Sequence, residues 1–137
     1  MLGFAGSQDY YDWQRVIDGS VATCTEYATT VQVDAALAWL QSAPEPWICY
    51  VPFMAAHTPH MQPPAGLYYE DLSGTPGERK LFKATDEALD TEMGRLLDGI
   101  EQAGYARPLI IFAADNGTDD SVVVPPVVAG KAKGTLY

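Results

Sequence analysis

Three short stretches of the sequence carry side chains that could do chemistry together. Asp115-Asn116-Gly117 offers a carboxylate and an amide oxygen, the hard donors that Ca²⁺ and Mg²⁺ take as ligands. His57 could hydrogen-bond a metal-held anion or protonate a leaving group, and Lys133 could hold an anion as a point charge. These residue types suit an anionic ligand bound beside a hard cation.

Each of these residues also has a simpler interpretation. Asp-Asn-Gly is ordinary turn chemistry after a strand, and two oxygens are too few for Ca²⁺, which takes about six to eight. His57, taken singly, reads as a loop histidine bonded to the backbone. Lys133 reads as a solvated lysine, and Lys131 competes with it because spacing does not choose between them.

A second histidine, His60, stands further from the preceding apolar run and has the weaker claim to chemistry. The three-residue spacing from His57, in a loop broken by proline, argues against a shared zinc site. Four acids lie in a predicted helix, and we expect them to form its solvated face rather than an acid/base pair: Asp86, Glu87, Asp90 and Glu92.

Two apolar runs must position these residues. Residues 47–53 and 109–114 are continuous runs rich in aromatic and β-branched side chains, which predicts strands buried on both faces. His57 and Asp115 follow the ends of these runs. In an α/β sheet ligands gather beyond the carboxyl ends of the strands, so we expect the two residues at one sheet edge.

A helix is predicted before each run. The first begins at a cap on Thr29 or Thr30 and continues to about residue 42. The second follows a Thr75-Pro76 start, continues to Gln102 and closes at Gly104. Residues 1–26 show no clean period and are expected to be irregular, apart from a short strand around residues 15–17. The order of elements predicts an α/β fold, with a partial mixed sheet flanked by helices.

Composition limits the partners. The 137 residues are 47% hydrophobic and carry a formal net charge of -10, so the chain is globular and repels nucleic acid and anionic membranes. No apolar stretch is long enough to span a bilayer, and the start has no signal-peptide pattern, which leaves export undecided. An anionic substrate must therefore be captured by local cations or a metal.

In combination, these stretches resemble the sulfatase family of the alkaline phosphatase superfamily. The similarity covers residues 27–137 in family order, whereas 1–26 match poorly, so the whole chain is interpreted as one partial catalytic domain. The matching stretches are residues 27–30, 47–59, 83–97, 109–117 and 133–137.

The resemblance implies the sulfatase fold and hydrolysis of sulfate esters, from a small molecule or a sulfated glycan. It assigns Asp115 and Asn116 as ligands of one Ca²⁺ (or Mg²⁺). It assigns His57 and Lys133 to sulfate binding and to departure of the leaving oxygen. A fixed cation and positioned donors stabilise the charge that builds on that oxygen.

The sequence departs from the family at the nucleophile. Sulfatases use a formylglycine made from a Cys/Ser-x-Pro-x-Arg motif, and neither Cys24 nor Cys49 lies in one. The tandem aspartates of the family's first strand are also missing. The resemblance therefore implies an internal piece of a sulfatase, lacking both ends of the catalytic domain and inactive alone.

Two other functions stay open. A phosphodiesterase or phosphonate hydrolase of the same superfamily would use the same half-site, because phosphate and sulfate esters share tetrahedral anionic geometry. A non-catalytic acidic binding module or remnant would show only weak, diffuse cation binding.

Overall fold

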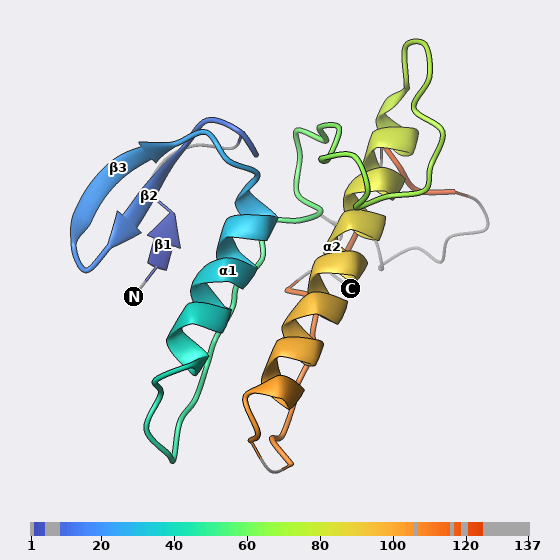
Figure 1. Cartoon of the computed structure of the whole chain (residues 1–137). Coiled ribbons are helices and arrows are strands. Elements are labelled where there is room, and N and C mark those ends of the chain that lie inside the picture. Colours follow the sequence, from blue (N-terminus) through green and yellow to red (C-terminus); the bar gives the residue numbers. More distant parts are fainter. Residues whose placement is uncertain (1, 5–8, 106, 116, 119–120, 125–137) are drawn as a thin grey trace.

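The computed structural model describes residues 2–4, 9–105, 107–115, 117–118 and 121–124. Its elements are β1 (Leu2–Phe4), β2 (Trp13–Ile17), β3 (Ser20–Cys24), α1 (Ala28–Leu40) and α2 (Glu78–Gln102) (Figure 1). The described chain is therefore α/β, as predicted. None of its helices has the length and apolar character needed to cross a membrane.

The N-terminal strands form an antiparallel sheet in the order β1-β2-β3. β2 and β3 are joined by a hairpin turn at Asp18-Gly19, where both residues have positive φ (49° and 84°), as a tight two-residue turn requires. The expectation that residues 1–26 are irregular is wrong, although the short strand predicted around residues 15–17 is confirmed within β2. The Asp-Gly dipeptide was the available hairpin signal.

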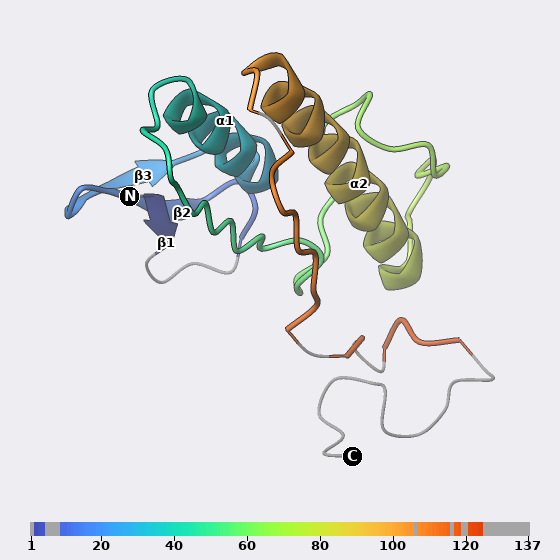
Figure 2. The same ribbon diagram turned by 90° about the horizontal axis from the view of Figure 1, so that it is seen from below.

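The two helices run in the same direction and lie side by side (Figures 1 and 2). Their predicted positions are confirmed, but the predicted N-caps are wrong, because Tyr27 and Gly77 precede the helices and neither makes a side-chain capping bond. Gly104 does close α2, with φ of 78° and its N–H donating to the Glu101 carbonyl at 3.0 Å. That left-handed conformation costs glycine little.

Residues 47–53 and 109–114, here called the first and second extended segments, are not strands, which corrects the prediction. Each leaves the C-terminal end of a helix and returns along it in an extended path (Figures 1 and 2). A strand needs a neighbour to accept and donate its backbone hydrogen bonds, and among the described residues neither segment belongs to a sheet. The predicted mixed sheet is therefore absent from the described chain.

The expected burial on both faces is also wrong. In the first extended segment Ile48 and Tyr50 are 93% and 84% exposed, while the alternate side chains pack on the helices. The second extended segment exposes every large apolar side chain: Leu109, Ile110, Ile111 and Phe112.

The core has two parts. An aromatic cluster joins the sheet to the start of α1 and to Ala88 of α2; its buried members are Tyr10, Trp13, Cys24, Tyr27, Ala28, Val31 and Ala88. A helix seam lies further along α1 and α2, with the first extended segment packed against it; its buried members are Val33, Ala36, Leu40 and Leu96.

Candidate functional site

His57 lies in the turn that follows the first extended segment and is exposed. Its backbone N–H donates to the Met54 carbonyl at 2.8 Å, and its ring Nδ1 lies 2.6 Å from the Thr58 carbonyl oxygen. Because a carbonyl oxygen only accepts, Nδ1 must carry the hydrogen. This contact fixes the ring and leaves Nε2 as the atom that can exchange a proton with a ligand.

Tyr10 holds this turn in place, although sequence analysis missed it. The Tyr10 side chain is fully buried, and its hydroxyl donates to the His57 carbonyl at 2.9 Å. Its ring stacks on Tyr27 with centroids 5.5 Å apart. Burial raises the pKa of Tyr10 well above its ordinary value, so the hydroxyl stays a donor. The aromatic cluster thus anchors the backbone of His57.

His60 is buried and has a structural partner. Its Nδ1 lies 2.8 Å from Oε2 of Glu78, and its ring meets Phe82 edge-on with centroids 5.3 Å apart. These contacts tie the loop after His57 to the first turns of α2. The described structure therefore gives His60 a role in positioning the loop, and Glu78 is a second residue that the sequence pattern did not reveal.

The metal and anion residues are placed less fully. Asp115 follows the second extended segment and its side chain is exposed. Asn116 and Lys133 lie outside the described residues. Of the four proposed site residues, the structure therefore places only His57 and Asp115.

The described residues do not by themselves fit a calcium cage. Nowhere in the described ranges do three His, Cys, Asp or Glu side chains come together in an arrangement that could hold a metal. The Asp115 carboxylate is one oxygen donor group, whereas Ca²⁺ takes about six to eight oxygen ligands.

Glu92 is the clearest correction among the acids. Asp86 and Asp90 are exposed, as expected of a solvated face, but Glu92 is only 2% exposed. Its Oε1 accepts from the Thr30 hydroxyl at 2.6 Å, and its Oε2 accepts from Nε of Arg95 at 2.7 Å. A buried carboxylate needs such partners, so Glu92 is a link between α1 and α2.

Comparison with known proteins adds no relative: no protein-family model, curated protein or solved structure matches this chain.

Proposed function

We propose that this chain forms part of the active site of a sulfatase-type hydrolase that cleaves sulfate esters. In this proposal His57 serves the leaving oxygen and Lys133 binds the sulfate. Asp115 and Asn116 supply two ligands of a Ca²⁺ or Mg²⁺ ion. The nucleophile is not provided by these residues.

The observation that carries the proposal is the parallel course of the two extended segments. Both run from the C-terminal end of a helix back toward its N-terminal end (Figure 1), and each is followed by a residue of the proposed site, His57 or Asp115. Segments that return in the same direction end on the same side of the helix pair. That arrangement supports a shared site for residues that are far apart in the sequence.

The ring geometry of His57 suits the role proposed for it. With Nδ1–H donating to the Thr58 carbonyl at 2.6 Å, the protonated imidazole would donate from Nε2 to a leaving oxygen. The turn that carries the ring is held by the buried Tyr10 hydroxyl. A fixed donor of this kind costs little reorganisation when charge develops on the ester oxygen.

Calcium titration of the purified chain tests the metal half of the proposal. We expect calorimetry to detect one specific site that Asp115→Ala weakens at least tenfold, because a carboxylate ligand is lost. Asp98→Ala, an exposed acid on α2, is the matched control and should change the affinity less than twofold. Equal effects of the two substitutions, or diffuse binding alone, would favour the acidic binding module.

Aryl sulfate hydrolysis tests the catalytic half. The chain alone should show no multiple turnover with Ca²⁺, because the loss of a covalent nucleophile costs several orders of magnitude in rate. Steady turnover above buffer that His57→Ala abolishes would show that a nucleophile exists within the chain, contrary to the proposal.

A further inference from the structure

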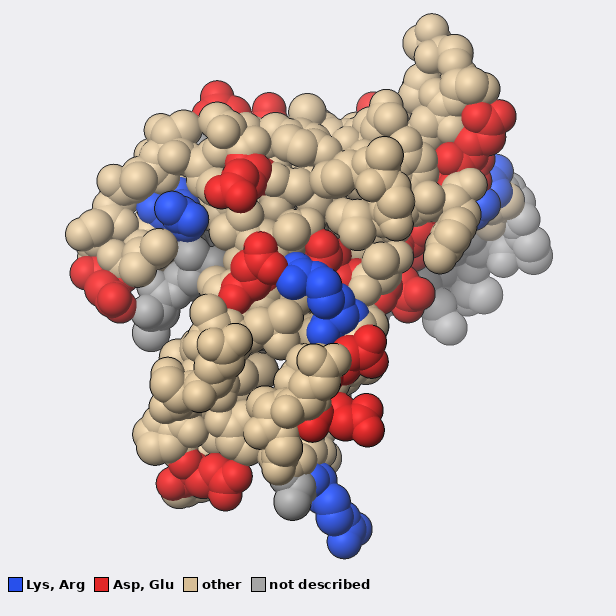
Figure 3. Space-filling model, in the orientation of Figure 1, with Lys and Arg blue, Asp and Glu red and all other residues tan. Residues whose placement is uncertain are grey.

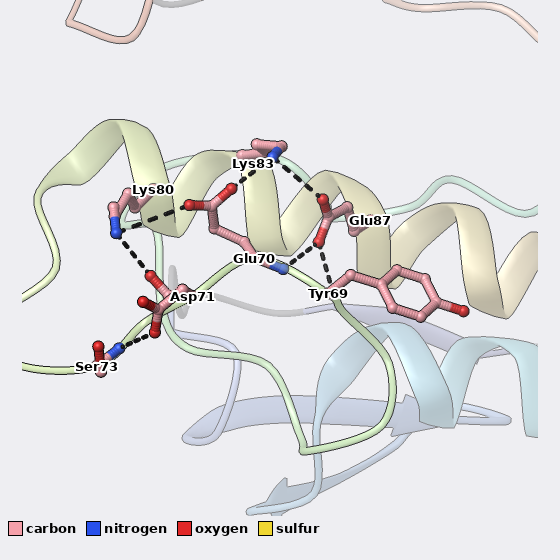
Figure 4. Close-up of polar contacts among 7 residues, drawn as sticks. All are labelled: Tyr69, Glu70, Asp71, Ser73, Lys80, Lys83 and Glu87. Carbon is pink, nitrogen blue, oxygen red and sulfur yellow. Dashed lines mark hydrogen bonds and ion pairs between the residues drawn. The ribbon is translucent and has the colours of Figure 1, made fainter.

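An open cavity lined by charged residues lies beside the first turns of α2, and none of its lining residues belongs to the proposed active site. Its volume is about 330 Å³, and it is lined by Glu70, Arg79, Lys80 and Lys83. Figure 4 shows the loop that carries Glu70 lying against the helix that carries the two lysines. This volume is enough for a small ligand.

The residues that line the cavity are mostly cationic, although the chain as a whole is acidic. The chain as a whole carries -10, and acidic residues are spread over the face seen in Figure 3. Three of the four lining residues are cationic. The Arg79 guanidinium makes no hydrogen bond or ion pair with any other described residue. A guanidinium that has no partner within the described part of the chain, beside two ammonium groups, is a capture point for an anion.

Glu70, which also lines the cavity, pairs with the two lysines. Its Oε2 accepts from Nζ of Lys83 at 2.5 Å, and its Oε1 lies 3.8 Å from Nζ of Lys80. The Glu70 carboxylate raises the pKa of Lys83. Glu70 therefore already acts as an internal anion and competes with any ligand for these two lysines.

The other nearby acids bond to the backbone, and Glu87 also pairs with Lys83, with Oε1 lying 3.6 Å from Nζ. Oε2 of Glu87 accepts from the backbone N–H groups of Tyr69 and Glu70 at 2.7 and 2.8 Å. Asp71 accepts from the Ser73 N–H at 2.9 Å, and its carbonyl accepts from Nζ of Lys80 at 2.8 Å. These contacts fix the loop against α2 (Figure 4), so the cavity wall is held in place without a ligand.

We propose that this cavity binds a tetrahedral oxyanion, a phosphate or sulfate group that is either free or part of an ester. Arg79 supplies a two-pronged donor, and Lys80 and Lys83 supply point charges to further oxygens. Three separate cationic groups match the three or four oxygens of such an anion better than the two of a carboxylate. The site uses no residue of the proposed active site and does not depend on it.

Calorimetric titration of the full chain at constant ionic strength, with inorganic phosphate, inorganic sulfate and phenyl phosphate, tests the proposal. We expect saturable binding of at least one anion at one site, about tenfold weaker in Arg79→Gln because a charge-assisted contact is lost. Arg107→Gln removes one charge from an exposed arginine outside the cavity and should weaken binding less than twofold. Glu70→Gln should tighten binding at least threefold, since the internal competitor loses its charge.

Two results would overturn the proposal. The first is an equal effect of Arg79→Gln and Arg107→Gln, which would mean that only the overall field attracts anions. The second is an unchanged or weaker affinity of the Glu70→Gln variant for the anion, provided that circular dichroism shows this variant to be folded like the wild type. If a variant misfolds, amide chemical shifts of the wild-type chain decide, because phosphate should move residues 69–71 and 77–83 and leave β2 unmoved. Stronger binding of phenyl phosphate than of phosphate would identify an ester as the ligand, and equal binding would identify the free ion.

Discussion

The aromatic cluster and the extended segments are both apolar, yet the structure treats them in opposite ways. Tyr10 and Trp13 are fully buried, whereas Ile48 is 93% and Leu109 88% exposed. In the cluster the Tyr10 hydroxyl and the Trp13 N–H both have hydrogen-bond partners, so burial of these polar groups costs little. The extended segments have no covering layer among the described residues. Apolar composition alone therefore does not decide which residues stabilise the described fold.

The largest loss of stability is expected at the centre of the aromatic cluster. Trp13 is fully buried, and its Nε1 donates to the Glu26 carbonyl at 2.9 Å. Trp13→Ala should lower the free energy of unfolding by about 3–5 kcal/mol, because it leaves a cavity and an unpaired carbonyl. Tyr69→Ala, at a ring that is 90% exposed, is the control and should cost less than about 0.5 kcal/mol. Similar losses in urea denaturation would mean that the two regions do not differ.

A smaller effect is expected where the helices are linked by charge. Arg95 pairs with the buried Glu92 and with Asp34, whose side chain is 57% exposed. Glu92→Gln should cost about 1–3 kcal/mol, because the buried acceptor of Arg95 loses its charge. Asp34→Asn should cost at most about 1 kcal/mol, since water screens an exposed pair. Denaturation curves that rank the two in the reverse order would contradict the assignment of Glu92 as the link.

These contacts show where sequence reasoning stopped. Helical spacing located α1 and α2, because periodicity is written locally in the sequence. It placed Glu92 on the solvated face, since an acid in a helix does not reveal a partner on another helix. The bonds from Tyr10 to His57 and from His60 to Glu78 join residues 47 and 18 positions apart. A single sequence carries no signal for such pairs.

The extended segments show a second limit of prediction from sequence. Their composition predicted strands, which is wrong, because a strand also needs hydrogen-bonding neighbours. Among the described residues none is provided, so the same side chains remain exposed. The predictions for His57 and Asp115 depend on the ends of these segments, and Asn116 and Lys133 lie beyond what the structure describes. The site thus stays a prediction, whereas the α/β class is confirmed.

A pair of neighbouring residues sharpens the comparison within the first extended segment. Val51 packs against the helix seam, while Tyr50 is 84% exposed. Val51→Lys should cost about 1–2 kcal/mol through lost burial, and Tyr50→Lys less than about 0.5 kcal/mol. Exposed apolar segments without strand partners favour self-association, so Tyr50→Lys should also reduce the oligomer fraction in sedimentation velocity. A wild-type chain that sediments as a compact monomer would contradict this expectation.

The smallest effect on stability at neutral pH is expected at Tyr27, a buried residue of the aromatic cluster. Burial raises the pKa of Tyr27 to about 12, and the nearby Thr29 hydroxyl offsets only part of this rise. Neither hydroxyl has a hydrogen-bond partner of acceptable geometry among the residues that the structure describes. Tyr27→Phe should therefore change the free energy of unfolding by less than about 1 kcal/mol at pH 7, because no bond is lost.

The difference in unfolding free energy between Tyr27→Phe and the wild type should grow at alkaline pH. The ordinary pKa of tyrosine is 10.0, so above pH 10 the unfolded chain releases the Tyr27 proton while the folded chain keeps it. Stability that is complete below pH 10 is then lost at up to about 1.4 kcal/mol per pH unit until pH approaches 12. Tyr27→Phe removes this loss and should flatten the decline, leaving the part due to Tyr10, whose pKa is also raised by burial. Tyr50→Phe, at an exposed ring, should decline as the wild type does. Equal slopes for Tyr27→Phe and wild type in urea denaturation between pH 9 and 11 would mean that the Tyr27 hydroxyl reaches water in the folded chain and that the cluster is less closed than its geometry indicates.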